Sequence, residues 1–518
     1  MNSVVSLSDR FRHKIKTAEE IAKAVGPRPR KKKVIMCHGV FDVVHPGHLR
    51  HLLYAKSKAD ILVASLTADR HIAKGQYRPH VPQDLRALNL AAFELVDYVL
   101  IDPEQTPLTN LGLIQPDFFA KGYEYTATGL PPKTLEERDI VHGYGGEIIF
   151  TPGDFVYSSS RLIEAAPPNI RVEKLMMLME GAGLTFDSLR KTLDKLGGRR
   201  VHVVGDTIVD SLTHTSMIGG QTKTPTISVL YEKRIDYIGG AGIVAEHLRA
   251  AGADVVFSTV LGDDALKDFV LEGLAKAGIE CKAVIDRTRP TTNKNAIVSG
   301  GYRLLKIDTL DNQSITDDIL GVIAKAVKET PTDAVVFSDF RHGMFNRRTI
   351  PTLVKAIPPK SYKVADSQVA SRWGNITEFK DFDLITPNER EARFATGDQD
   401  SGIRPLAVSL YDTARCKTLI LKLGDKGVLT CRGGDHESAD SFFVVDSFVD
   451  RLVDGVGAGD ALLAYATLSL MVTRDPVAST IIGVMAAACE CERDGNLPVT
   501  VDDVRRKLEA VERQTAFA

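Results

Sequence analysis

Short apolar runs alternate with longer, helix-like segments along most of the chain. In the N-terminal part the apolar runs fall at 34–37, 61–66, 98–101, 118–121 and 147–150, with helical periodicity near 47–58 and 83–95. Strands separated by helical stretches of this length predict a parallel sheet with crossover helices. This first series ends near residue 164.

A second series follows the segment AAPPNIR at 165–171, whose two prolines oppose helix continuation. Strands are predicted at 200–204, 254–259, 334–338, 363–365, 384–385 and 418–422. Two stretches, 212–238 and 290–310, break the rhythm and are rich in Thr, Tyr, Ile and Val. They predict antiparallel strands outside the main sheet. We therefore expect an α/β chain with a first domain at 1–165, a linker at 166–184 and a second domain at 185–518.

The composition is that of an ordinary globular protein. Of 518 residues, 44% are hydrophobic and 25% are charged, and the formal net charge is -2, which disfavours a protein that depends on bulk attraction to nucleic acid. The basic run at 28–33 fits a solvated linker better. No apolar run reaches the roughly 18–20 residues of a membrane span, and the N-terminus lacks a signal-peptide core. Six scattered cysteines without a CxxC pair predict neither zinc nor disulfides. We expect a cytoplasmic protein that binds neither nucleic acid nor membranes.

The first candidate site is a histidine pair at a strand-to-helix turn. His45 and His48 lie in HGVFDVVHPGHL, between the apolar run at 34–37 and the helical stretch at 47–58. A helix N-terminus offers unpaired N–H groups and a positive dipole end, and Gly47 lets the backbone approach a ligand closely. Two imidazoles there can donate hydrogen bonds to phosphate oxygens as negative charge develops.

GVFDVVHPGH resembles the GxFDxxHxGH signature of the HIGH-type nucleotidyltransferases, the cytidylyltransferase-like superfamily with a Rossmann-like fold. The resemblance covers about 15–165 and includes AKSKAD, KGQYRPHVPQDLR, FAKGYEY and YSSSRLI. It implies catalytic roles for His45, His48 and Lys74, and nucleotide or phosphate contacts from Gly39, Phe41, Asp42, Gly47, Lys56, Arg86, Lys121, Ser158, Ser159 and Ser160. The serines also fit plain helix capping, and Lys74 and Lys121 fit solvated surface lysines. An Arg-Thr pair usual before the serines in CTP-using relatives is missing, which favours ATP over CTP.

The second candidate site is the glycine-rich turn DGVGAGD at 454–460. Gly457, Ala458 and Gly459 precede Asp460 and an apolar helical stretch. Backbone N–H groups of such a turn can hold a phosphate, and an aspartate there can take a proton from a substrate hydroxyl. By itself the turn also fits close packing of a helix on a strand.

GAGD resembles the second signature of the PfkB/ribokinase family of sugar kinases, an α/β fold with a small β lid. The match covers about 185–515 and includes VGDTIVD, GGAGIVAEHLRAAGA, SDFRHG, TPNEREA and LILKLGDKG. The resemblance implies that Asp460 is the catalytic base and that Asn388 and Glu391 organise Mg²⁺, a cation that prefers oxygen ligands. It implies nucleotide contacts from Gly457, Ala458, Gly459, Lys422, Gly424 and Gly427, and sugar contacts from Asp206, Asp210, Gly239, Gly240, Ile243 and Asp339.

Several positions depart from the sugar-kinase pattern. Ile243 stands where the family has Asn, Lys422 where it has Thr, and His342 where the resembled heptose kinases have Lys. Gly455 and Val456 replace a Thr-Thr pair. The catalytic-type residues remain, so we expect an active kinase with a shifted sugar preference.

With both resemblances, the chain is similar to the bifunctional ADP-heptose synthases, but the order of its domains is reversed. They imply a heptose 7-phosphate 1-kinase and a heptose 1-phosphate adenylyltransferase that use ATP and Mg²⁺, and a homodimer formed through the lid. The alternative is a CTP-dependent cytidylyltransferase for a polyol or sugar phosphate, joined to a divergent or non-catalytic kinase domain that senses sugar or nucleotide.

Overall fold

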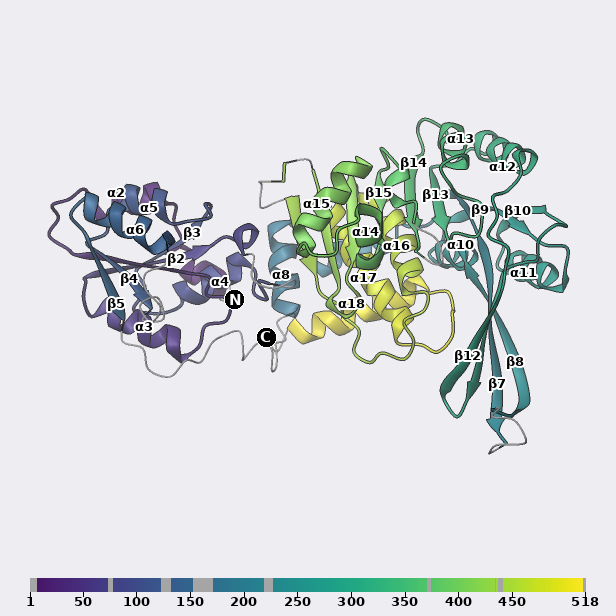
Figure 1. Ribbon diagram of the computed structural model, residues 1–518, viewed down its shortest axis with the longest axis horizontal. Coiled ribbons are helices and arrows are strands. Elements are labelled where there is room, and N and C mark those ends of the chain that lie inside the picture. The colour runs from purple at the N-terminus through teal and green to yellow at the C-terminus, as the bar shows by residue number, and fades with distance from the viewer. Residues whose placement is uncertain are drawn as a thin grey trace. The chain divides into compact units, whose positions relative to one another are not determined.

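A computed structural model describes residues 7–72, 78–122, 132–151, 171–218, 227–369, 374–433, 435–436 and 441–515. The chain divides into two compact units, Met1–Ile170 and Arg171–Ala518 (Figure 1). Helix α8, Arg171–Gly181, opens the second unit and buries Leu175 and Met179 there. None of the described helices has the length and hydropathy to cross a membrane.

The first unit is built on a five-stranded parallel sheet in the order β3-β2-β1-β4-β5. Its strands are β1 Val34–Gly39, β2 Ile61–Thr67, β3 Tyr98–Asp102, β4 Phe118–Gly122 and β5 Glu147–Thr151. Its described helices are α1 Leu7–Arg12, α2 Ala18–Val25, α3 Pro46–Lys56, α4 Gln83–Ala91, α5 Leu108–Ile114 and α6 Pro132–Gly143. All five apolar runs form the expected strands, and the parallel sheet is confirmed.

Alternate residues of β1 face two different helical layers. Val34 and Met36 pack in a cluster with α2, α5 and α6, whereas Ile35 and Cys37 pack with α3 and α4 (Figure 1). Successive side chains of a strand point to opposite faces. A strand covered on both faces therefore has no polar alternation, which explains the uninterrupted run VIMC.

Part of the basic run at 28–33 is structural rather than solvated. Arg28 donates to the carbonyl oxygens of Tyr144 and Gly145 at 2.9 and 2.8 Å. Arg28 and Arg30 each lie 3.4 Å from the carboxylate of Asp117. The two arginines hold the segment before β1 against the segments before β4 and β5, and the three lysines that follow them are exposed.

Arg86 in α4 is a fully buried cation that joins three segments of the first unit. Its guanidinium donates to the carbonyl oxygens of Val81 at 2.9 Å and Thr67 at 2.8 Å, and also to that of Val40. It forms an ion pair with Asp69 at 2.6 Å. A buried guanidinium requires such partners, so Arg86 fixes the loop after β1 to the end of β2.

We expect Arg86→Leu to lower the free energy of unfolding of the first unit by about 3–5 kcal/mol, because it removes a fully buried guanidinium and leaves its acceptors unpaired. Arg138→Leu is the control: Arg138 pairs with Asp139 at an exposed site, and such pairs contribute about 0–1 kcal/mol. Chemical denaturation of the two variants measures the difference. Equal, small losses would contradict the structural role of Arg86.

The second unit combines a nine-stranded sheet with a four-stranded one. The large sheet has the order β10 Glu280–Ile285, β9 Asp254–Leu261, β6 Arg200–Gly205, β13 Ala334–Asp339, β14 Tyr362–Ser367, β15 Leu384–Ile385, β16 Thr418–Lys422, β17 Val428–Arg432 and β18 Phe442–Val445. The first seven strands in this order are parallel, and β17 and β18 continue the sheet antiparallel.

The described helices of this unit, besides α8, are α9 Phe186–Leu193, α10 Ala241–Ala250, α11 Ala265–Lys276, α12 Asp317–Glu329, α13 Thr349–Ala356, α14 Glu389–Thr396, α15 Ile403–Ala414, α16 Ala458–Thr473, α17 Pro476–Cys491 and α18 Val501–Thr515. Helices α16 and α17 are apolar around most of their circumference and pack together inside the core. A helix that is hydrophobic on all sides is typical of a buried position.

The four-stranded sheet arises from the two stretches that break the strand–helix rhythm. Its order is β12 Tyr302–Thr309, β11 Asn293–Ser299, β7 Thr207–Met217 and β8 Val229–Gly240. Strands β7, β8 and β12 project from the body of the unit (Figure 1). The lid outside the main sheet is confirmed, but its pairing is mixed: β7 and β11 belong to different hairpins and pair in parallel.

Candidate active sites

The histidine pair of the first unit lies in the turn between β1 and α3. His45 caps α3, since its Nδ1 accepts the N–H of Gly47 at 3.1 Å. A Cβ on Gly47 would lie 2.8 Å from the ring of His45, so this cap requires glycine. Because Nδ1 is the acceptor, the proton of neutral His45 is on Nε2, where it can be donated to a phosphate.

His48 stacks beside His45, with ring centroids 4.0 Å apart, and lies 5.2 Å from the ring of Phe41. Burial and the neighbouring His45 lower the pKa of His48 to about 4, and burial and Arg50 lower the pKa of His45. Both imidazoles are therefore neutral donors at neutral pH. Two such donors at a helix start can stabilise charge that develops on a phosphoryl group.

Three of the residues expected to contact the nucleotide shape this turn. Asp42 is buried, and its carboxylate accepts the N–H of Val81 at 2.9 Å. Phe41 has a positive φ of 50°, and its ring would lie 3.3 Å from a Cβ on Gly39. These contacts hold the turn in place, and direct contact with a nucleotide remains a prediction for all three.

Two expected phosphate contacts are corrected by the structure. Lys56 lies at the last residue of α3, about 15 Å along the helix from the histidine turn, with its Nζ 2.6 Å from the carboxylate of Asp97. Arg86 has no exposed surface, and its donors are held by protein acceptors. Both cations are held by acceptors within the protein.

The remaining nucleotide predictions for this unit stay open. Lys121, next to the last residue of β4, forms an ion pair with Glu137, and both side chains are nearly buried. Lys74, Ser158, Ser159 and Ser160 lie outside the described residues. Their roles remain predictions from the resemblance.

A buried polar cluster at the same sheet edge has no counterpart in the sequence predictions. The ring of His38 is hydrogen-bonded to Ser65 Oγ at 2.9 Å and Thr67 Oγ1 at 3.2 Å, and its Nδ1 lies 3.8 Å from Asp102. Burial lowers the pKa of His38 to about 3. These residues come from the ends of β1, β2 and β3, so only the strand order brings them together.

In the second unit, the glycine-rich turn begins α16. Gly457 is the N-cap residue, with a left-handed φ of 83°. A Cβ there would lie 2.4 Å from Asn496 Oδ1 and 3.0 Å from Glu490 Oε1, so both backbone and space require glycine. The first N–H groups of the helix have no intrahelical acceptors, and they make the turn suitable for an anion.

Asp460 lies in the first turn of α16 and is buried. Burial and the nearby Asp366 raise its pKa well above the ordinary value, while Lys422 opposes the rise. Lys422 Nζ lies 3.1 and 3.2 Å from the two carboxylate oxygens of Asp366. Asp366 is a site residue that the sequence predictions missed. It could have been identified from its position near the carboxyl end of β14, because ligand-binding groups gather at that edge of a parallel sheet.

Asn388 and Glu391 form a capping box at the start of α14. Asn388 Oδ1 accepts the N–H of Glu391 at 2.8 Å, and the Glu391 carboxylate accepts from the Asn388 N–H and Nδ2, each at 2.6 Å. Burial raises the pKa of Glu391, and Lys422 opposes it. These oxygen donors fit Mg²⁺. Each oxygen of the Glu391 carboxylate already accepts one hydrogen bond from Asn388. The two residues therefore fit an ion that they contact through its bound water molecules rather than directly.

A cavity of about 730 Å³ adjoins this cluster. Its lining includes Asn388, Lys422, Gly424, Arg390 and Phe394, a combination of cations, backbone and an aromatic ring that suits a nucleotide. The predicted contact Gly427 has a different role. A Cβ on it would lie 2.1 Å from the carbonyl oxygen of Val445, so this glycine permits close packing against β18.

Asp206 is expected to face a sugar, but its carboxylate holds a loop instead. It is buried and accepts the N–H groups of Phe340, His342 and Met344 at 3.1, 3.2 and 3.3 Å. Burial and the nearby Asp339 raise its pKa. Three backbone donors occupy this carboxylate, so Asp206 positions the loop after β13.

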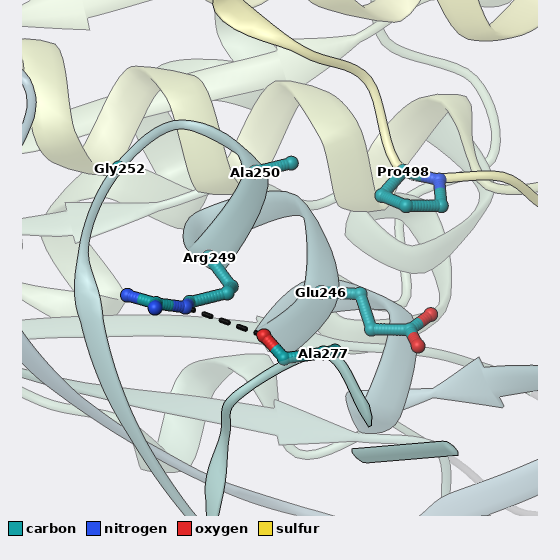
Figure 2. Close-up of a pocket in the computed structure, with 6 residues that line it drawn as sticks. All are labelled: Glu246, Arg249, Ala250, Gly252, Ala277 and Pro498. Carbon is teal, nitrogen blue, oxygen red and sulfur yellow. Dashed lines mark hydrogen bonds between the residues drawn. The ribbon is translucent and has the colours of Figure 1, made fainter. Parts of the chain in front are cut away.

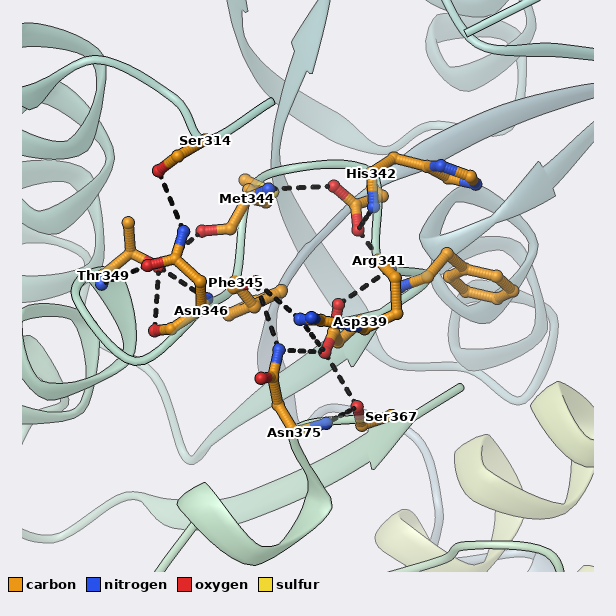
Figure 3. Close-up of polar contacts among 12 residues, drawn as sticks. Ser314, Asp339, Arg341, His342, Met344, Phe345, Asn346, Thr349, Ser367 and Asn375 are labelled. Carbon is orange, nitrogen blue, oxygen red and sulfur yellow. Dashed lines mark hydrogen bonds and ion pairs between the residues drawn. The ribbon is translucent and has the colours of Figure 1, made fainter. Parts of the chain in front are cut away.

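Asp339 is likewise occupied within the protein. Figure 3 shows it beside Ser367 and Asn375, which donate to its carboxylate at 2.7 and 2.8 Å. The N–H of Arg341 donates to it at 2.8 Å. Ile243, another expected sugar contact, has no exposed surface. The roles expected for Asp339 and Ile243 are thus corrected to positioning and packing.

Asp210 is the expected sugar contact that stays open to a ligand. It accepts no hydrogen bond from the residues that the structure describes. Its carboxylate oxygen would lie 2.1 Å from a Cβ on Gly239, and its charge raises the pKa of Asp460. Gly240 has a positive φ of 63°, and a Cβ at this position would clash with the backbone of Asp206. The two glycines therefore let Asp210 and the start of α10 approach each other.

Lys294 and Lys306 of the lid act electrostatically on both Asp210 and His342. Burial, followed by Lys294 of β11 and Lys306 of β12, lowers the pKa of His342 to about 4, so its ring is neutral at neutral pH. Both ring nitrogens of His342 lack a hydrogen-bond partner within the described parts of the chain. The same lysines oppose the burial that raises the pKa of Asp210. Asp210 is thus a carboxylate with two lysines among its charged neighbours.

A second cavity of about 460 Å³ lies at the other end of α10 (Figure 2). It is lined by Glu246, Arg249, Ala250, Gly252, Ala277 and Pro498. Arg249 donates to the carbonyl oxygen of Ala277 at 3.3 Å, and burial raises the pKa of Glu246 to about 7. None of the residues predicted from sequence lines it.

A parallel sheet extended by two antiparallel strands, a β lid and a buried aspartate at a glycine-rich helix start together define a sugar-kinase fold in the second unit. Residues 200–499, more than half of the chain, match the model of the pfkB family of carbohydrate kinases, and the chain belongs to this family. Residues 36–165 match the model of the cytidylyltransferase-like family.

Curated relatives are named as bifunctional proteins. Bifunctional protein HldE of Bradyrhizobium diazoefficiens is 26% identical over 334 residues, 63% of this chain and 65% of that protein. Bifunctional protein HldE of Geobacter metallireducens is 37% identical over 138 residues, 26% of this chain and 27% of that protein. The chain therefore spans less than two thirds of the length of these relatives.

Solved structures show the fold of the kinase unit independently. Escherichia coli phosphofructokinase-2 in complex with substrates and products aligns with a TM-score of 0.51 at 17% identity, covering 61% of this chain and 100% of that one. The same enzyme in complex with potassium also aligns with a TM-score of 0.51 at 17% identity, with the same coverage. At this identity the likeness establishes the fold alone.

We expect Asp206→Asn to loosen the loop after β13. Each hydrogen bond to a charged acceptor is worth about 1.5–3 kcal/mol, so amide hydrogen exchange at Phe340, His342 and Met344 should accelerate at least about tenfold. Asp210→Asn is the matched control and should leave these three amides unchanged. Unchanged exchange in the Asp206 variant would contradict its positioning role.

Proposed function

We propose that this chain is a bifunctional cytoplasmic enzyme that contains a sugar kinase and a sugar-1-phosphate nucleotidyltransferase. The proposed substrates are heptose 7-phosphate and ATP for the kinase, and heptose 1-phosphate and ATP for the transferase, whose product is an ADP-heptose-type sugar. The kinase half of this proposal rests on one observation: Asp460, Glu391 and Lys422 lie together beside the Gly457 turn.

In the kinase unit, Asp460 is suited to accept the proton of the sugar hydroxyl. Burial and neighbouring carboxylates raise its pKa, which favours proton uptake as the hydroxyl oxygen attacks the γ-phosphorus. The bond between the γ-phosphorus and the β-bridging oxygen then breaks, and ADP leaves. N–H groups of the Gly457 turn face the charge on the transferred group. Bound Mg²⁺ would neutralise phosphate charge, and Asn388 and Glu391 would hold its water shell.

The charges around Asp210 support an acceptor that carries a phosphate. Asp210 can accept hydrogen bonds from sugar hydroxyls, while Lys294, Lys306 and His342 offer donors to a phosphate at the other end of the molecule. The charges of Lys294 and Lys306 act on the pKa of both Asp210 and His342. This combination favours a sugar 7-phosphate over a neutral sugar.

In the first unit, the histidine turn is suited to nucleotidyl transfer. A phosphate oxygen of the sugar 1-phosphate attacks the α-phosphorus of ATP, and pyrophosphate leaves. His45 donates from Nε2, and His48 lies beside it as a second neutral donor to the developing charge. The missing Arg-Thr pair supports ATP as the nucleotide.

We expect Asp460→Asn to abolish phosphorylation of sugar 7-phosphates and to leave nucleotidyl transfer to sugar 1-phosphates intact. His48→Ala should have the opposite effect and lower nucleotidyl transfer by about 100-fold or more, since it removes a donor to the transition state. Mass spectrometry of the products, with ATP and with CTP, measures both reactions. Loss of both activities in either folded variant would contradict two independent sites. Transfer without kinase turnover on any sugar would instead favour a sensing kinase domain.

The proposed homodimer is supported by an apolar surface on the lid. Leu305 and Ile307 share one face of β12 and are 59% and 48% exposed. Tyr302 on the same strand and Leu230 and Tyr231 on β8 are also exposed. Strands β12 and β8 are the two edges of the four-stranded sheet, and exposed apolar edges are typical association surfaces. The proposed occupant is the lid of a second copy.

We expect Leu305→Asp to convert the dimer to a monomer, because it places a charge in the proposed apolar interface. Val322→Asp is the control, since Val322 of α12 is similarly exposed at 54% but lies away from the lid. Light scattering coupled to size-exclusion chromatography measures the mass of each variant. A wild-type monomer, or a dimer that survives Leu305→Asp, would contradict the lid interface.

A further inference from the structure

Lys422 is a cation enclosed by carboxylates at the kinase site. It ends β16, and its Nζ lies 3.1 and 3.2 Å from the carboxylate oxygens of Asp366. Glu391 and Asp460 lie close enough for its charge to lower the pKa of each. Three carboxylates from three different elements therefore share one ammonium group.

The backbone fixes Lys422 on both sides of this cluster. Its N–H donates to the carbonyl oxygen of Pro387 at 2.8 Å, and it pairs with Asn388 as an isolated parallel bridge. A Cβ on Gly459 would lie only 3.1 Å from Lys422 Nζ. The ammonium therefore lies directly against the turn whose N–H groups face the transferred phosphoryl group.

The charge balance of the cluster determines what this ammonium can do. Burial lowers the pKa of Lys422, but Asp366 and Glu391 raise it above the ordinary value, so the group stays protonated. An ammonium has three N–H donors, and the two oxygens of Asp366 take at most two of them. Three buried carboxylates would otherwise repel an incoming phosphate, because such repulsion is strong at low local dielectric.

We propose that Lys422 contacts the γ-phosphoryl group of ATP in the kinase site and that Asp366 is the positioning residue that holds it there. Lys422 keeps its proton throughout. The hydroxyl proton goes to Asp460, the new bond joins the sugar oxygen to the γ-phosphorus, and the bond to ADP breaks. This inference rests on the proposed kinase function. On this proposal, the lysine that stands where the family has threonine adds a contact to phosphate.

The test compares Lys422→Met with Lys417→Met. Lys417 immediately precedes the other end of β16 and forms its own ion pair with Asp383 at 2.7 Å, so it is a matched lysine outside the site. Calorimetry with a non-hydrolysable ATP analogue, at fixed Mg²⁺ and without sugar, measures binding apart from turnover. Steady-state kinetics with a sugar 7-phosphate measure kcat and KM.

For Lys422→Met we expect about tenfold or more weaker binding of the analogue and about 100-fold or more lower kcat. Lys422→Arg should recover part of both, because it retains the charge. Asp366→Asn should lower kcat more than it changes KM for ATP, since the ammonium is kept but no longer held. Lys417→Met should match the wild type in every measurement.

Two results would overturn the proposal. One is analogue binding and kcat that are unchanged in Lys422→Met; the other is an increase in either, which would mean that the ammonium obstructs the site. If the wild type phosphorylates no sugar, the proposed kinase function fails, but the calorimetric comparison still tests the phosphate contact. If Lys422→Met does not fold, Lys422→Arg and Asp366→Asn must still show a lower kcat than the wild type for the proposal to stand.

Discussion

The parallel sheet is the constraint on which both candidate sites depend. Parallel strands end at one edge, and residues far apart in sequence meet there. In the second unit Asp339, Asp366 and Lys422 lie at or near the ends of three such strands, and Asn388 follows a fourth. In the first unit the histidine turn comes after the end of β1 in the same way. The chemistry of each unit is thus set by the residues at the carboxyl ends of its strands.

This concentration of side chains creates an electrostatic difficulty that the structure resolves residue by residue. Buried carboxylates are costly unless they are paired or hydrogen-bonded. Asp206 is satisfied by backbone N–H groups, Asp339 by Asn375 and Ser367, and Asp366 by Lys422. Asp460 is left with a strongly raised pKa, which suits a group that must gain a proton during the reaction.

Sequence patterns predicted the local geometry well, because strand periodicity, glycine turns and capping residues act over short distances. The β1–α3 turn and the glycine-rich helix start at Gly457 both occur where the motifs placed them. Long-range pairing could not be predicted in the same way. Arg86 and Lys56 were expected at a ligand, but acceptors distant in sequence hold them. Asp366 was missed because its position beside Lys422 depends on the order of the strands.

The departures from the sugar-kinase pattern also differ in what they change in the structure. Ile243 is fully buried, so the missing amide there removes a contact without placing anything new at the pocket surface. Lys422 instead adds a charge among three carboxylates, and His342 presents two ring nitrogens without partners in the described structure. Each of the three acids around Lys422 would be destabilising if it were unpaired, and the ammonium offsets their charge. The arrangement is that of a phosphate site.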